Sequence, residues 1–184
     1  FVETELNIEG YPSQAFIEMV LMVKPDQVTL VPDAPDAITS SSGWDCIEHA
    51  SMLSEVIGRF KEAGIRTSVF LDPVVKQVLY AAKTGADRIE LYTESYAEGF
   101  LKDKEAAVKP FIRAALEASD EGLDLNAGHD LDLDNLAFFV EKVKGLNEVS
   151  IGHALICDAL YFGLDNTIKM YLHQIQKGYQ RSLS

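Results

Sequence analysis

Two Gly-His pairs stand at the ends of two apolar runs and are the first candidates for chemistry in this chain. Gly128 and His129 occur in "LNAGHDL". Gly152 and His153 occur in "SIGHAL", and the chain has only four histidines in all. Glycine lets a backbone approach an anion closely, and histidine can exchange a proton near neutral pH. A single such histidine could merely fill a turn, but two at equivalent places indicate phosphate binding or, for His129, general acid–base catalysis.

Two glutamates are the carboxylate candidates. Glu9 follows an apolar residue in "NIEG", and Glu90 lies inside "RIELYT" between Ile89 and Leu91. The period-two alternation of a strand puts Glu90 on the face opposite to its two neighbours. An ionised carboxylate is costly there unless that face is polar, so we expect both glutamates at a polar site. The simpler alternative is that each glutamate pairs with a nearby Arg or Lys.

Two polar stretches are expected to be loops. The stretch 31–45 is long and rich in Pro, Ser and Thr, and Thr39 is placed best in it to donate a hydroxyl to a phosphate. Such a loop could also be merely solvated. The stretch 92–105 carries Lys and Glu residues and is interpreted as a solvated connection.

The elements that must position these residues alternate regularly between strand and helix patterns. Strands are expected at 2–9, 27–32, 66–72, 88–93, 124–129 and 148–155, and helices at 13–24, 44–63, 73–84, 106–121, 134–144 and 158–179. Glycines expected just after helix ends are Gly64, Gly85, Gly122 and Gly145. Asp72 precedes a proline and is expected to cap the helix that follows.

This alternation predicts one α/β domain over residues 1–184 with a parallel sheet. Every unit has a polar residue at or near the carboxyl end of its strand, namely Glu9, Asp33, Asp72, Glu90, His129 and His153. A (β/α)8 TIM barrel builds its site from those ends, whereas a doubly wound sheet concentrates its site at one switch point. No glycine-rich nucleotide motif follows any strand, so the barrel is preferred. Six units cannot close it, and we expect about two more upstream of Phe1.

Composition excludes several classes of partner. A formal charge of −13 and a pI near 4.6 argue against nucleic acid and anionic membranes. The two cysteines, Cys46 and Cys157, have no metal-type spacing and are expected to be buried thiols in a reducing cytoplasm. No signature of a metal site is present, and no metal is expected.

Six motifs distributed in order along the chain resemble the pyridoxine 5′-phosphate synthase family. They are "LNIEG", "VTLVPD…ITSSSGWD", "AGIRTSVFLD", "GADRIELYTESYA", "LNAGHDL" and "SIGHALICDAL". The resemblance implies a (β/α)8 barrel with extra helices, assembled as a homo-octamer. It also implies condensation of 1-deoxy-D-xylulose 5-phosphate with 3-amino-2-oxopropyl phosphate, which gives pyridoxine 5′-phosphate, phosphate and water without metal or organic cofactor.

The resemblance also implies three catalytic roles. Glu9 of "NIEG" matches the acid–base glutamate of the family, and His129 of "NAGH" matches its proton donor. Glu90 of "IEL" matches the carboxylate that stabilises the transition state.

Substrate contacts follow from the same resemblance. Thr39 matches a contact to the deoxyxylulose phosphate, and Gly152 with His153 match the site of the amino-ketone phosphate. Asp130 stands where the family form has a substrate-contacting glycine, so an anionic side chain there would have to turn away from a phosphate. The family's Asn-x-Asp-His phosphate site, a second catalytic histidine and an arginine have no counterpart in the 184 residues.

Two other functions remain open from the residues alone. A barrel isomerase or aldolase of sugar phosphates could use Glu9, Glu90 and the histidines to bind a divalent metal. Alternatively, the chain could be an inactive barrel remnant or a packing subunit.

Overall fold

The structure is a computed structural model that describes residues 2–33, 37 and 39–183. Its strands are β1 (Asn7–Gly10), β2 (Gln27–Leu30), β3 (Arg66–Leu71), β4 (Arg88–Tyr92), β5 (Asp124–Gly128) and β6 (Leu146–Ser150). Its helices are α1 (Gln14–Val23), α2 (Ala50–Glu62), α3 (Val75–Lys83), α4 (Glu94–Asp120), α5 (Leu136–Lys142), α6 (His153–Phe162) and α7 (Leu164–Ser182).

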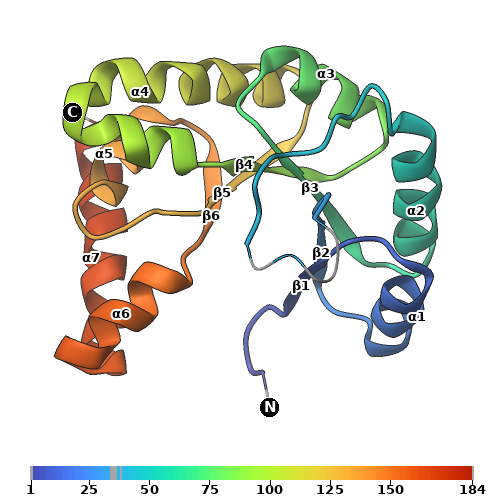
Figure 1. The fold of residues 1–184 in the computed structure, drawn as a ribbon, viewed down its shortest axis with the longest axis horizontal. Helices are drawn as coiled ribbons and strands as arrows, with labels where there is room; N and C mark the ends of the chain where they lie inside the picture. The colour runs from blue at the N-terminus through green and yellow to red at the C-terminus, as the bar shows by residue number, and fades with distance from the viewer. Residues whose placement is uncertain (1, 34–36, 38, 184) are drawn as a thin grey trace.

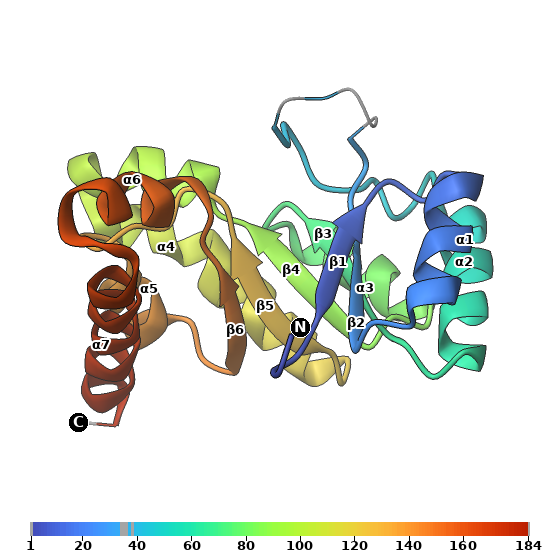
Figure 2. The ribbon, with the colours of Figure 1, turned by 90° about the horizontal axis from the view of Figure 1, so that it is seen from below.

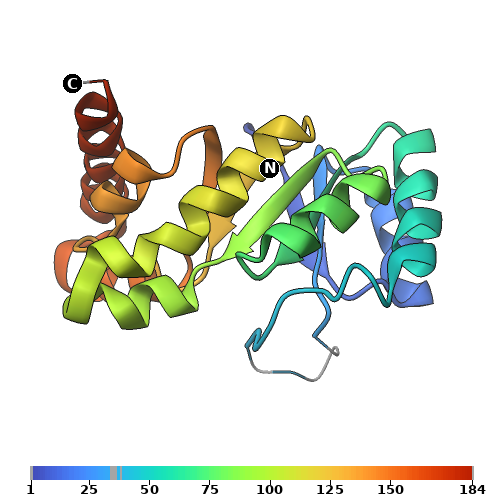
Figure 3. The same cartoon turned by 90° about the horizontal axis from the view of Figure 1, so that it is seen from above.

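The six strands pair in sequence order into one parallel sheet, with β1 and β6 at its edges. The sheet curls, and the helices cover its outer side while the side between β1 and β6 stays open (Figure 1). Figure 3 shows α4 lying across this outer side, where it packs on β4 and β5. The expected six βα units and the partial (β/α)8 barrel are thus confirmed.

The two faces of the sheet differ because side chains alternate along each strand. Apolar side chains of the outer face, such as Val28, Leu71 and Ile89, are fully buried under the helices. The helices contribute large side chains to this core, among them Phe60 of α2 and Phe111 of α4, which are also fully buried. The inner face carries polar side chains, namely Glu9, Gln27, Thr29, Arg66, Ser68, Arg88, Glu90, Asn126 and Glu148.

One predicted loop and one predicted helix differ from the structure. The stretch 92–105 is not a loop, because α4 begins at Glu94 and continues through a kink at Asp103. Tyr96 on this first part is fully buried and packs on Phe139 of α5, so tertiary packing stabilises a helix that its charges had concealed. The final predicted helix is instead two helices, which part at Gly163.

Helix ends follow the glycine prediction but not the aspartate prediction. All four expected glycines have the positive φ of a residue that terminates a helix, between 74° and 86°. Asp72 does not cap α3, which begins only at Val75. Its carboxylate instead accepts a hydrogen bond from the backbone N–H of Gly43 at 3.0 Å, which ties the long connection after β2 to the end of β3.

The described part of the connection between β2 and α2 projects beyond the carboxyl ends of the strands (Figure 2). Trp44 anchors its far end, because the indole is buried and donates a hydrogen bond to the Leu30 carbonyl at 3.0 Å.

No helix in the described ranges combines the length and the apolarity needed to cross a membrane.

Candidate active site

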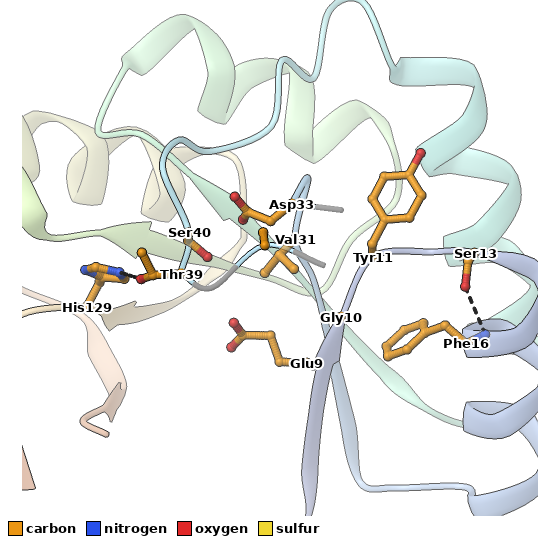
Figure 4. A pocket seen from close by; sticks show the side chains of 11 residues that line it. Glu9, Gly10, Tyr11, Ser13, Phe16, Val31, Asp33, Thr39, Ser40 and His129 are labelled. Atoms are coloured by element: carbon orange, nitrogen blue, oxygen red, sulfur yellow. Dashed lines mark hydrogen bonds between the residues drawn. The ribbon is translucent and has the colours of Figure 1, made fainter. Parts of the chain in front are cut away.

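A cavity of about 510 Å³ opens at the carboxyl ends of the first strands, under the connection that follows β2. Its lining consists of Glu9, Gly10, Tyr11, Ser13, Phe16, Val31, Asp33, Ala37, Thr39, Ser40 and His129. Glu9, Asp33 and the pair of Thr39 and His129 point into one space (Figure 4). Three of the predicted site residues, which lie up to 120 positions apart in the chain, therefore share one cavity.

His129 is held at the end of β5 in an uncommon backbone conformation. Its φ is 87°, in the left-handed region that residues with a side chain seldom adopt. The buried Thr93 stabilises this turn, since its hydroxyl donates to the Gly128 carbonyl at 2.7 Å and also contacts the His129 carbonyl. His129 Nε2 then lies 3.0 Å from the Thr39 hydroxyl oxygen.

Tyr92 links the histidine to the connection above it. Its ring packs edge-on against the His129 ring, with centroids 4.7 Å apart. Its hydroxyl donates a hydrogen bond to the Ser40 carbonyl at 3.0 Å. Tyr92 is buried and so fixes the segment that carries Thr39 next to His129.

Glu9 keeps contact with solvent at the end of β1. Its pKa is raised, first because the surrounding cavity wall partly removes water from the carboxylate and then because the negative charge of Asp33 lies near. His129 acts in the opposite direction on this pKa. A raised pKa makes a carboxylate a stronger base, so Glu9 takes up a proton more readily than an ordinary glutamate does.

Glu90 lies inside the curled sheet and is only 2% exposed. Burial raises its pKa to about 8, and the negative charges of Glu9 and Glu148 add to this effect, while the hydroxyls of Ser150 and Thr29 oppose it. Its carboxyl comes so close to Gly128 that a Cβ at that position would lie 2.3 Å from Oε1. The glycine of "NAGH" is therefore needed to make room for Glu90.

A second cluster of polar side chains fills the interior of the curled sheet toward the amino ends of the strands. Arg88 donates to Glu148 at 3.1 Å and to Gln27 at 3.2 Å, and Asn126 donates to the same Glu148 carboxylate at 3.3 Å. These contacts neutralise part of the charge below Glu90. The alternative that Glu90 itself pairs with a neighbouring cation is not what the structure shows, because Glu148 receives Arg88 instead.

The other predicted site residues lie outside the cavity lining. Gly152 precedes α6 and His153 begins it; both are exposed, and neither lines the cavity. Asp130, which is exposed, lies beside His129, and its carboxylate oxygen Oδ2 is 3.1 Å from His129 Nδ1.

Sequence reasoning missed Tyr92 and Thr93, which hold His129 in place. One signal was available for Tyr92, because it lies two residues after Glu90 and therefore on the same face of β4.

The prediction for the cysteines was half right, since Cys46 is a buried thiol but Cys157 is an exposed one. Within the ranges that the structure covers, no three His, Cys, Asp or Glu side chains are grouped to hold a metal ion.

Comparison with known proteins identifies relatives of this arrangement. The sequence profile of the family described as pyridoxal phosphate biosynthesis protein PdxJ matches residues 1–177. Pyridoxine 5′-phosphate synthase of Cytophaga hutchinsonii is 61% identical over 176 residues, which cover 96% of this chain and 74% of that protein. The protein of the same name from Parabacteroides distasonis is 58% identical, over 92% of this chain and 71% of the relative.

Solved structures with low sequence identity share the fold. The crystal structure of citrate synthase SbnG is similar with a TM-score of 0.58 at 16% identity, over 96% of this chain and 75% of that chain. The tryptophan synthase A-subunit of Pyrococcus furiosus has a TM-score of 0.57 at 15% identity, over 98% of this chain and 67% of that chain. At such identities the likeness concerns the fold alone.

Proposed function

We propose, from the premise that this chain belongs to the pyridoxal phosphate biosynthesis protein PdxJ family, that it condenses 1-deoxy-D-xylulose 5-phosphate with 3-amino-2-oxopropyl phosphate. The products are pyridoxine 5′-phosphate, inorganic phosphate and water. The observation that carries the proposal is the convergence of Glu9, Thr39 and His129 on one cavity at the carboxyl ends of the strands. Active sites of (β/α)8 barrels are built at this end.

Proton transfer in this reaction is the role of Glu9 and His129. The amine of one substrate attacks the ketone carbon of the other, and loss of water gives an imine. Loss of phosphate, ring closure and a further dehydration each require a proton to be taken from one atom and given to another. Support comes from the raised pKa of Glu9 and from the placement of His129 Nε2 toward the cavity beside Thr39.

Glu90 supplies a neutral carboxyl group. Because its pKa is raised to about 8, it keeps its proton near pH 7 and can donate a hydrogen bond to a group that gains negative charge. The absence of a side chain on Gly128 lets this carboxyl lie against the strand that carries His129.

Phosphate groups are bound at two places in this proposal. The Thr39 hydroxyl contacts the deoxyxylulose phosphate at the cavity, and Asp130 contacts substrate through its backbone. Gly152 and His153 receive the amino-ketone phosphate at the start of α6, where free backbone N–H groups and the helix dipole favour an anion. Both anchors fix the reactants with respect to each other and so lower the entropic part of the barrier.

The test is synthesis by the full-length protein from the two substrates in the presence of a chelator, with the product identified by mass spectrometry. Glu9→Gln and His129→Gln should each lower kcat about 100-fold or more, as expected for loss of general acid–base catalysis. His173→Gln, at an exposed position on α7, is the matched control and should leave kcat unchanged. Absence of product, or activity that the chelator abolishes, would overturn the proposal and favour the metal-dependent alternative.

Two further expectations accompany this function. The family resemblance supports a homo-octamer, which sedimentation equilibrium would test. Two free thiols, Cys46 and Cys157, support a reducing compartment such as the cytoplasm.

A further inference from the structure

We propose that Asp130 is a positioning residue that fixes the tautomer and orientation of the His129 ring. The inference deepens the proposed function, because it rests on His129 as the group that moves protons. It gives the side chain of Asp130 a role of its own, as a partner of the histidine, beside the backbone contact to substrate.

The contact between the two side chains is direct. Asp130 Oδ2 lies 3.1 Å from His129 Nδ1. This nitrogen is buried and makes no hydrogen bond to any described residue, so the two groups are close but are not aligned as a hydrogen bond.

The backbone explains why two successive residues can meet in this way. Both adopt left-handed conformations, with φ of 87° at His129 and 57° at Asp130, which folds the turn tightly. Thr93 holds the His129 carbonyl, and Asn135 Nδ2 donates to the Asp130 carbonyl at 3.1 Å. Both side chains are thus presented from a turn that is fixed on each side.

The charge of Asp130 selects one tautomer of the neutral ring. A carboxylate accepts hydrogen bonds only, so it favours a proton on Nδ1 and repels the lone pair that an unprotonated Nδ1 would present. Nε2 is then free of its proton and accepts a hydrogen bond from the Thr39 hydroxyl, 3.0 Å away. The atom that faces the cavity therefore carries the lone pair that takes up a proton, which the ring can then donate in a later step.

Backbone preference alone does not account for an aspartate at this place. Glycine adopts a φ of 57° without steric cost, and aspartate only tolerates it, so the backbone favours glycine at this position. An anionic side chain is also unfavourable near a substrate phosphate unless it turns away. The structure shows that its carboxylate lies beside His129 Nδ1, with Oδ2 3.1 Å from that nitrogen.

The test is the tautomer of His129, measured by ¹⁵N NMR of the imidazole rings in the full-length protein at mildly alkaline pH. Selective histidine labelling gives few signals, and His129→Gln identifies the one that matters. The wild type should show the proton on Nδ1. Asp130→Gly should shift the ring toward the Nε2–H form, which free imidazole side chains prefer, and should lower kcat at least about tenfold with little change in either KM.

Controls separate this role from structural effects and from the proposed function. Asp134→Gly removes a carboxylate from an exposed position four residues away and should change neither the tautomer nor kcat. Asp130→Gly should unfold at the same or a higher urea concentration, because glycine adopts a φ of 57° without steric cost. An Nε2–H ring in the wild type, or an unchanged tautomer in Asp130→Gly, would overturn the inference. The tautomer is read without turnover, so failure of the synthase assay does not affect it.

Discussion

Replacement of Glu90 by Gln should make the protein more stable, and the gain should grow with pH. In the unfolded chain this carboxyl ionises around its ordinary value of 4.5, whereas burial raises its pKa to about 8 in the fold. Below the unfolded value both states are protonated, and Glu90 has no effect on the pH dependence. Between the two values only the unfolded state loses its proton, so the free energy of unfolding falls as pH rises.

The magnitude follows from the difference between the two pKa values. Each pH unit in this interval removes about 1.4 kcal/mol from the free energy of unfolding, which amounts to about 5 kcal/mol once pH exceeds about 8. Glu90→Gln abolishes the ionisation while nearly keeping the shape. The stability difference between variant and wild type should therefore increase by about 2.5 kcal/mol between about pH 5 and about pH 7.

Urea unfolding of both proteins across this pH range measures the difference directly, because other titrating groups are common to both. Glu62→Gln, at an exposed position of α2, controls for the loss of one negative charge. A difference between Glu90→Gln and wild type that stays constant over this range would refute the conclusion that Glu90 is neutral in the fold.

Three other predictions concern packing around the site and the two thiols. Gly128→Ala should lower the free energy of unfolding by about 1–3 kcal/mol, because its Cβ would overlap the Glu90 carboxyl; urea unfolding would detect no loss if that approach were absent. Thr93→Val should cost about 1–3 kcal/mol and lower kcat, since two carbonyls of the histidine turn lose their donor; unchanged stability and kcat would contradict this role. Iodoacetamide should modify only Cys157 in the native protein, because Cys46 is buried and its pKa is raised to about 12; mass spectrometry showing two adducts before unfolding would contradict this.

Much of the fold was predictable because it depends on local periodicity. Alternation of strand and helix patterns predicted six βα units, and glycines such as Gly64 and Gly145 predicted where helices end. These signals are local, since a left-handed residue ends a helix whatever surrounds it. The stretch 92–105 was mispredicted because its charges hid the side chains, Tyr96 among them, that pack it as a helix.

The candidate site was predictable in its members but only partly in their arrangement. Position at strand ends and the motif resemblance selected Glu9, Thr39 and His129, and these three do line one cavity. The same reasoning selected Gly152 and His153, which the structure places at the exposed start of α6.

The sequence by itself thus determined the order of the elements, the polar inner face and the residue types available for acid–base chemistry. These depend on patterns within a few residues, which tertiary contacts modify little. Tertiary structure alone decided that Glu90 is buried beside Gly128 and that Asp130 turns to His129 Nδ1. Ionisation and side-chain direction depend on lost solvent and on neighbours distant in the chain, and both exist only once the sheet has curled.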